Sequence, residues 1–432
     1  MSITEKLFKL RENGTDVRTE IVAGITTFLT MAYIIFVNPA ILGDAGVPKE
    51  AVFVATCLAA ALGTTIMALY ANYPIGMAPG MGLNAYFAYA VVLGMGVPWQ
   101  SALGAVFISG CLFIIVSLLG LRGMIVNGIP HSLRTAITVG LGLFLGLIAL
   151  KSAGIVTANP ATMIAAGDLH KPPALMAIFG FMLIVALDRL KVKGAILIGI
   201  VAVTLLSFVF GGNQFNGLFS APPSLDPTFL KLDIGGALSV GIVNVVLVFF
   251  LVELFDATGT LMGVANRAGL LVPGKMERLN KALLADSGAI VAGSLLGTSS
   301  TTAYVESAAG VQAGGRTGLT ALTVAVLFLA CLFISPLAGV VPAYATAPAL
   351  LFVSCLMLRD LADLEWGETT ESIPAAITAM LIPFTYSIAH GIAFGFITYA
   401  VLKLATGRAR EVKPVVWVIA IVFAFKYAYL PG

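Results

Sequence analysis

Long apolar runs, separated by short polar turns, fill almost the whole of this 432-residue chain. Many runs approach the about 20 residues that a helix needs to cross the hydrocarbon core of a bilayer. They predict spanning segments at 21–42, 51–71, 79–95, 98–120, 132–150, 173–188 and 194–211, and again at 237–264, 282–297, 301–313, 317–341, 344–358, 374–404 and 414–430. Segment 374–404 contains Pro383 and Gly391, so a broken crossing and a re-entrant hairpin both remain open. The pattern predicts an all-α polytopic membrane protein of about 14 segments.

The composition supports this interpretation. Hydrophobic residues make up 59% of the chain and charged residues only 10%, against about 25% charged in soluble domains. The 24 basic and 21 acidic residues nearly balance, and no basic patch with interleaved aromatic residues points to a nucleic-acid partner. The four cysteines lie singly in apolar segments, which favours small core residues over a disulfide framework or a metal site.

Enzyme motifs are missing from the sequence. There is no H-E-x-x-H and no G-x-S-x-G, and the G-x-G-x-x-A match at 80–85 follows no soluble strand. An intramembrane enzyme would need a nucleophile–base pair or a metal cluster, and the sequence offers neither. We therefore predict that the protein is not an enzyme and has no cofactor.

Basic residues gather near the N-terminus and near positions 190 and 275, whereas the linker 212–236 contains only Lys231. By the positive-inside rule, the N-terminus is cytoplasmic and the linker is extracellular or periplasmic. The charged residues 1–20 are predicted to form a cytoplasmic N-terminal helix instead of a signal peptide. A further basic cluster at 403–413 fits this orientation only if 374–404 re-enters the membrane.

An internal repeat divides the chain into halves at 21–211 and 237–432. Asn84-Ala85-Tyr86 lies 218 positions before Thr302-Ala303-Tyr304, and Phe36-Val37-Asn38 lies 218 before Leu254-Phe255-Asp256. The motif at 111–114 recurs 220 positions later. An odd number of segments per half makes the halves inverted repeats, an architecture of transporters whose sites lie where corresponding broken segments meet.

Two interrupted segments occupy corresponding places in these halves. Residues 73–87 contain two prolines and three glycines, and residues 298–302 are five consecutive hydroxyl residues. Extended backbone followed by a half-helix would place a positive helix end near the membrane centre. Tight helix packing by small residues is the alternative.

Three carboxyl residues lie inside apolar segments, where ionisable groups are costly and usually functional: Glu253, Asp256 and Glu306. Glu253 and Asp256 are three residues apart and share a helix face. Two such carboxylates would not both stay charged in a low dielectric, so one is expected to hold a coupling proton. The alternative is a structural carboxyl satisfied by Thr258, Thr260 or a half-helix end. Glu306 is expected one turn into the second half-helix.

The remaining candidates are polar or aromatic. Asn84 carries an amide that donates and accepts, which suits the edge of a heterocycle, and a helix N-cap is its alternative. Tyr86, Phe87 and Tyr304 are candidates for stacking on a planar ring or for core packing, and Thr302 is a candidate polar contact. Asp286, near a basic loop, is expected at the membrane interface.

At these positions the chain resembles the AzgA-like purine permeases of the nucleobase–ascorbate transporter superfamily. The resemblance covers nearly the whole chain and rests on Phe8–Arg11, Glu20–Met31, Val37–Pro39, Leu254–Leu261 and Thr302–Gly310. It implies fourteen segments as two inverted sevens, with a core domain from segments 1–4 and 8–11 and a gate domain from 5–7 and 12–14. Thr260 stands where many relatives of the uracil-permease branch carry a histidine, so a histidine contact is not available here.

The resemblance also implies the function: proton-coupled import of a purine across the inner or plasma membrane by an elevator-like movement of the core. Asn84, Glu253, Asp256 and Glu306 are then the substrate and coupling residues. Gly82–Phe87 resembles the hypoxanthine/guanine branch, and a site built for a 6-oxo purine should reject adenine. An adenine permease is the alternative, and an anion transporter of the same fold is a more distant one, because Glu306 opposes anions. Relatives often dimerise, which leaves a homodimer open.

Overall fold

The computed structural model describes residues 3–121, 125, 128–210, 217–238, 243–267, 271, 272, 275, 276 and 278–429. The chain forms two compact units, residues 1–118 with 149–349, and residues 119–148 with 350–432. The divisions fall inside the helices α8 (His131–Ser152) and α17 (Ala343–Met357). The first five residues of the predicted linker 212–236, with Gly211 before them, lie outside the described residues.

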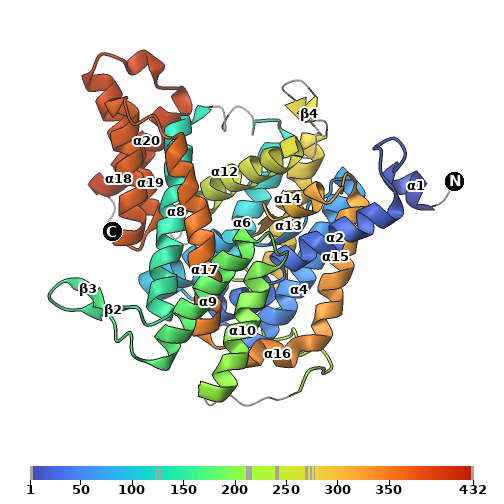
Figure 1. Ribbon diagram of the computed structural model, residues 1–432. Helices are drawn as coiled ribbons and strands as arrows, with labels where there is room; N and C mark the ends of the chain where they lie inside the picture. Colours follow the sequence, from blue (N-terminus) through green and yellow to red (C-terminus); the bar gives the residue numbers. More distant parts are fainter. Residues whose placement is uncertain are drawn as a thin grey trace. The chain divides into compact units, whose positions relative to one another are not determined.

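The first unit is built mainly from helices (Figure 1). Up to the linker its elements are α1 (Ile3–Phe8), α2 (Val17–Met31), α3 (Ile34–Asp44), α4 (Lys49–Ile66), a π-helix (Met67–Ala71), β1 (Met77–Pro79), α5 (Met81–Ala85), a second π-helix (Tyr86–Gly94), α6 (Trp99–Leu118), the end of α8, β2 (Val156–Asn159), β3 (Met163–Ala166), α9 (Pro172–Arg189) and α10 (Ala195–Phe210).

From the linker onward the first unit adds α11 (Ile234–Ala237), α12 (Val243–Arg267), β4 (Leu271–Val272), β5 (Lys275–Met276), α13 (Leu279–Leu296), β6 (Thr301–Ala303), α14 (Ser307–Gln312), α15 (Gly318–Cys331), a 3-10 turn (Leu332–Ile334), α16 (Ser335–Val340) and the start of α17. The second unit contains the rest of α8 and α17, a 3-10 turn (Leu358–Asp363), α18 (Thr369–Phe384), α19 (Ile388–Ala405), another 3-10 turn (Ala409–Glu411) and α20 (Pro414–Tyr429).

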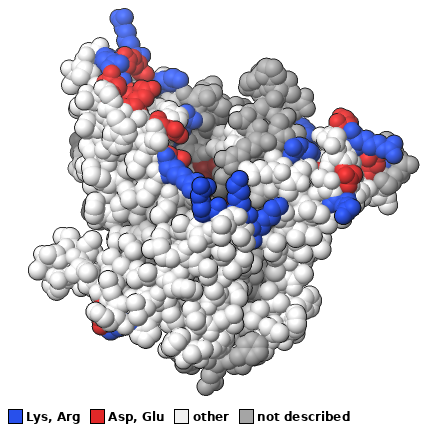
Figure 2. Space-filling model, viewed as in Figure 1, with Lys and Arg blue, Asp and Glu red and all other residues white. Residues whose placement is uncertain are grey.

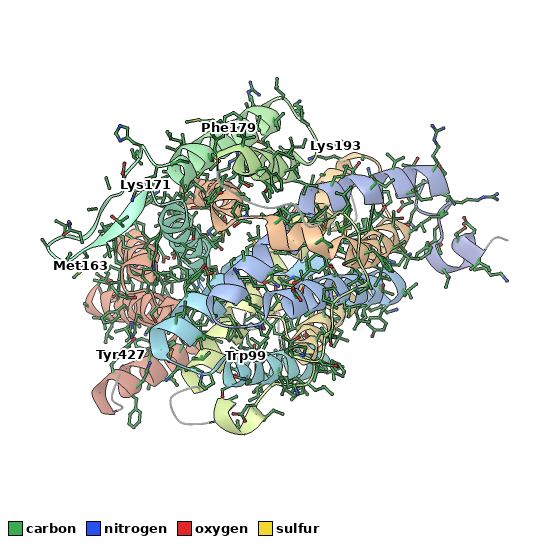
Figure 3. All side chains as sticks on the ribbon, turned by 90° about the horizontal axis from the view of Figure 1, so that it is seen from below. Trp99, Met163, Lys171, Phe179, Lys193 and Tyr427 are labelled. Atoms are coloured by element: carbon green, nitrogen blue, oxygen red, sulfur yellow. The ribbon has the colours of Figure 1, made fainter. Side chains whose placement is uncertain are left out.

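Ten helices of the described residues are long and apolar enough to cross a membrane, and three shorter apolar helices accompany them. The surface agrees with this reading, because uncharged side chains cover most of the face shown in Figure 2 and charged ones gather in clusters. Phe179 on α9 is half exposed, and Met163 at the tip of the β2–β3 hairpin is 85% exposed (Figure 3). The predicted segments 79–95 and 301–313 are not long helices, since each begins with a strand before its helix.

The predicted segment 374–404 is two helices. The chain breaks after α18, where Tyr386 has a φ of 53°, and Ser387 then caps the first turn of α19. α18 and α19 pack side by side (Figure 1). Gly391 lies inside α19 and does not cause the break; a side chain there would collide with Ile382 of α18.

The N-terminal segment differs from the single helix expected within residues 1–20. A short helix ends at Phe8, and α2 begins at Val17 with Asp16 as its N-cap. Hydrogen bonds from the backbone N–H and hydroxyl of Thr19 lower the pKa of Asp16. Of the four cysteines, Cys57 and Cys331 are buried as predicted, but Cys111 is only half-buried and Cys355 is exposed.

A buried ion network holds one end of the second unit. Lys403, with a side chain only 2% exposed, pairs with Glu371 at 2.8 Å and with Glu411 at 2.9 Å. Glu371 also accepts hydrogen bonds from the hydroxyls of Ser132 and Tyr399. The network therefore joins α8, α18, α19 and the turn after α19. Beside it, the hydrogen bond from Arg408 lowers the pKa of Glu368 to about 2.

Lys403→Met should destabilise the protein by about 3 kcal/mol, because it removes one partner from a buried ion pair and leaves Glu371 facing an apolar stem. Lys231→Met removes an exposed lysine of the linker and serves as the matched control. Thermal unfolding in detergent measures both. Equal unfolding temperatures for the two variants would show that the network does not stabilise the fold.

Candidate functional site

The two interrupted segments meet at a pair of short strands. β1 and β6 pair in antiparallel register, with Met77 opposite Ala303 and Pro79 opposite Thr301. The pairing continues beyond the strands, because the Gly80 N–H donates to the Ser300 carbonyl at 2.8 Å and the Tyr304 N–H donates to the Gly76 carbonyl at 3.0 Å. The prediction that corresponding segments of the two halves come together is confirmed for these residues.

Each strand leads into a short helix. Gly80 is the extended N-cap residue of α5, so Asn84 lies inside this helix and the N-cap alternative for Asn84 is wrong. Glu306 is the N-cap residue of α14, which corrects its expected place one turn into the helix. The reason is local: the backbone of residues 304–306 turns before α14 begins, so the helix starts later than the sequence pattern suggests.

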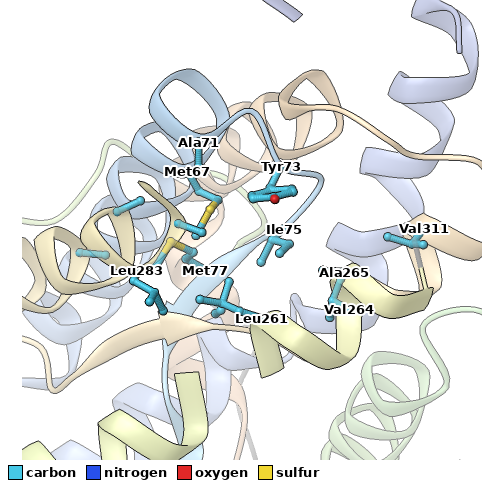
Figure 4. Packing of buried hydrophobic residues seen from close by; sticks show 14 residues of the cluster. Met67, Ala71, Tyr73, Ile75, Met77, Leu261, Val264, Ala265, Leu283 and Val311 are labelled. Atoms are coloured by element: carbon cyan, nitrogen blue, oxygen red, sulfur yellow. The ribbon is translucent and has the colours of Figure 1, made fainter. Parts of the chain in front are cut away.

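The strand pair is fixed by side chains of several elements. The Thr64 hydroxyl of α4 accepts from the Met77 N–H at 2.9 Å and donates to the Met77 carbonyl at 3.1 Å. The Tyr304 hydroxyl donates to the Pro79 carbonyl at 2.6 Å. A cluster of buried apolar residues from α12, α13 and both strands packs around them, including Leu261, Leu283 and Met77 (Figure 4). Hydrogen bonds and apolar packing therefore hold the β1–β6 pair, which we call the β1–β6 crossing.

Only one end of the Asn84 side-chain amide is hydrogen-bonded within the fold. Its Oδ1 accepts a hydrogen bond of 2.7 Å from the hydroxyl of Ser299, which lies between α13 and β6. Both residues are fully buried, and the Asn84 Nδ2 has no partner among the described residues. A buried amide nitrogen without an acceptor is costly, and Nδ2 is the atom of this pair that the fold leaves unsatisfied.

The three predicted carboxyl groups have different surroundings. Glu253 is fully buried and accepts from the Ser109 hydroxyl of α6 at 2.8 Å. Asp256 is exposed although it lies in the middle of the apolar helix α12, between two buried neighbours. Glu306 is half-buried and accepts from the Tyr33 hydroxyl at 2.6 Å. Asp256 is thus the most exposed carboxyl of this set.

Asp286 is the residue that sequence reasoning misplaced. It is fully buried on α13 instead of lying at an interface, and its Oδ1 accepts from the Thr302 hydroxyl at 2.9 Å and the Ala303 N–H at 3.0 Å. It anchors β6 and interacts electrostatically with Asp256, as Glu306 does. The signal that could have found it is an acidic residue within an apolar segment, the same signal that singled out Glu253.

The other predicted contacts are mostly occupied within the protein. Thr302 donates to Asp286, and Tyr304 donates to Pro79. Tyr86 stacks edge-on against Phe249 of α12 with ring centroids 5.1 Å apart, and Phe87 is fully buried. Helix α12 packs against both α5, which carries Asn84, and β6, which carries Thr302.

A second buried carboxylate escaped the sequence reasoning. Glu20 of α2 accepts from the backbone N–H groups of Arg316, Thr317 and Thr320 at the start of α15, and from the Thr320 hydroxyl. It satisfies the free donors of a helix N-terminus, so its role is structural. α2 and α15 lie side by side in Figure 1 as this cap requires.

Asp286→Ala should lower the stability of the first unit by about 1–3 kcal/mol, because the buried Ala303 N–H and Thr302 hydroxyl lose their acceptor. Asp286→Asn keeps one acceptor oxygen and should restore part of the loss. Thermal unfolding with Asp226→Ala, an exposed linker residue, as the control measures the difference. Identical unfolding of all three variants would contradict the anchoring role.

The family model Xan_ur_permease, described as Permease family, matches residues 18–394. The chain is 49% identical to the adenine permease AdeP of Escherichia coli K12, over 99% of this chain and 96% of that protein. It is 46% identical to the guanine/hypoxanthine permease PbuO of Bacillus subtilis 168, over 96% of this chain and 98% of that protein. The transmembrane domain of the cyanobacterial bicarbonate transporter BicA matches 86% of this chain and 97% of its own length, with a TM-score of 0.65 at 17% identity. This likeness confirms the predicted fold class, an all-α polytopic membrane protein.

Proposed function

Because the chain belongs to this permease family, and is therefore a multi-pass transporter and not an enzyme, we propose that it imports purine nucleobases together with protons. The observation that carries the proposal is the arrangement around the β1–β6 crossing. An unpartnered amide donor and an exposed carboxyl lie on α5 and α12, two elements that pack against each other in an apolar surrounding. A small planar heterocycle with a donor and an acceptor on one edge is complementary to such a site.

In this proposal Asn84 donates to an acceptor of the base, and Asp256 or Glu306 accepts from a ring N–H. Thr302, Tyr304, Tyr86 and Phe87 shape the wall of the site. Glu253, Asp256 and Glu306 are the candidates for the coupled proton, since three acidic groups in a membrane domain favour the binding of a proton. The same acidic character opposes an anion as the substrate, although the fold resembles that of a bicarbonate transporter.

Hypoxanthine and guanine are the proposed substrates. Their 6-oxo group accepts where Asn84 donates, and the neighbouring ring N–H donates where a carboxylate accepts. Adenine presents the reverse order on this edge, which would leave buried polar groups unpaired. An adenine permease is the second candidate, because the chain is 49% identical to AdeP and 46% identical to PbuO, so sequence similarity does not favour the first.

The proposed mechanism is an elevator-like movement. The chain divides into two compact units that share α8 and α17. This division differs from the expected core and gate domains, because α9 and α10, expected in the gate domain, belong to the first unit. All candidate site residues belong to the first unit, so the site would travel with it. The proposed topology has inverted repeats at 21–211 and 237–432, a cytoplasmic N-terminus and an external linker, and a homodimer is compatible with it.

Radiolabelled hypoxanthine should accumulate in proteoliposomes under an inward proton gradient, and a protonophore should abolish the accumulation. Guanine should compete, whereas adenine, uracil and xanthine should compete weakly. Best competition by adenine would keep the transporter and overturn the substrate preference. Absence of purine accumulation under any gradient would contradict the proposed function.

Asp256→Asn should abolish proton-driven accumulation, because the amide cannot carry the proton, while Asp226→Asn in the linker should transport normally. Asn84→Ala should reduce hypoxanthine uptake at least about tenfold, since it removes a buried donor to the substrate. Uptake at several values of pH measures both effects. Unchanged accumulation by Asp256→Asn would remove this residue from the coupling.

A further inference from the structure

We propose that Ser299 is a positioning residue that determines which half of the Asn84 amide faces the substrate, and thereby the choice between purines. The inference rests on the proposed function and deepens it. Its basis is the hydrogen bond of 2.7 Å from the Ser299 hydroxyl to the Asn84 Oδ1, which joins residues 215 positions apart in the sequence. An asparagine amide has a donor end and an acceptor end of nearly equal size, so a neighbouring group must decide its orientation.

The hydrogen-bond inventory around Ser299 favours one orientation. With the Asn84 Oδ1 toward Ser299, the serine hydrogen has an acceptor and the amide nitrogen remains free. If the amide were rotated by half a turn, Ser299 would accept from Nδ2, and its own hydrogen would lose its acceptor. No other hydrogen bond of the Ser299 hydroxyl exists among the described residues, and the side chain is fully buried. Water cannot replace the lost acceptor without opening this packing.

The position of Ser299 is itself fixed by the backbone. Gly297 ends α13 with a φ of 95°, a conformation that favours glycine, and the carbonyl of Ser300 receives the Gly80 N–H at 2.8 Å. Gly80 in turn is the N-cap residue of α5, the helix that carries Asn84. The serine and the asparagine therefore belong to one rigid crossing, and the hydroxyl cannot follow the amide if it rotates.

The consequence is a site that offers two N–H donors and no acceptor at this point. A carbonyl oxygen on the six-membered ring of a purine can accept from the Asn84 Nδ2 group. An exocyclic amine at the same place would put its own N–H donors against those of Asn84. Loss of the Ser299 hydroxyl would free the amide to rotate and present Oδ1 instead. The variant should then accept an amino-purine that the native protein rejects.

The test compares Ser299→Ala, Ser299→Thr and the native protein in proteoliposomes. For each, the measured quantity is the ratio between the inhibition constant of adenine and the KM of hypoxanthine. Ser299→Ala should lower this ratio by about tenfold, and Ser299→Thr, which keeps the hydroxyl, should retain it. Ser294→Ala is the matched control, because that buried hydroxyl donates to the Val291 carbonyl within its own helix, α13.

A merely structural role for Ser299 predicts a different result. Ser299→Ala would then reduce uptake of every purine alike and leave the ratio unchanged, which would overturn the proposal. Thermal unfolding of each variant with hypoxanthine or adenine added gives the same comparison where uptake is weak. If the native protein transports purines but prefers adenine, the import of purines stands, whereas the substrate preference and the orientation assigned to Asn84 by Ser299 both fail. Absence of purine transport by the native protein overturns both proposals.

Discussion

The antiparallel pairing of β1 with β6 is the interaction on which the rest of the site depends. Backbone N–H and C=O groups at membrane depth have no water to bind, so chain that is not helical must find partners within the protein. Here each interrupted segment supplies the partners of the other, from Gly76 with Tyr304 to Gly80 with Ser300. Neither segment could remain extended alone. The strand pair is therefore the reason that two short helices, α5 and α14, can begin at its opposite ends inside an apolar domain.

The same crossing explains why polar side chains gather there. Once β1 and β6 are paired, the side chains that follow them are held at fixed places: Asn84 on α5 and Glu306 before α14. Helices α12 and α13 pack against the strands and add Asp256 and Asp286. β1 and β6 lie more than 220 residues apart in the sequence, so the pair and the side chains held by it come from distant parts of the chain.

The sequence predicted the features that depend on local composition. Apolar run lengths located most of the helices, and the prolines, glycines and hydroxyl residues located both interrupted segments. It did not predict features that depend on a partner far along the chain. Glu20 and Asp286 look alike as isolated acidic residues, and the hydrogen bonds that define them reach donors at Thr320 and Ala303. Ser299 was one of five consecutive hydroxyl residues, and only its contact with Asn84 distinguishes it.

The carboxyl groups of this protein differ more in the donors that the fold supplies to them than in their burial. Glu20 receives three backbone N–H groups and a hydroxyl, which satisfy it within the fold. Glu371 is held by Lys403 and two hydroxyls in the same manner. Asp256 accepts no hydrogen bond from the described residues, is exposed within an apolar helix, and faces the charges of Glu306 and Asp286. Of these three groups, Asp256 has the fewest donors from the fold, so the proposal assigns the binding of a proton or of a ligand donor to it. A transporter needs such a group, because a carboxyl that the fold has already satisfied gains little from binding and would not respond to a substrate.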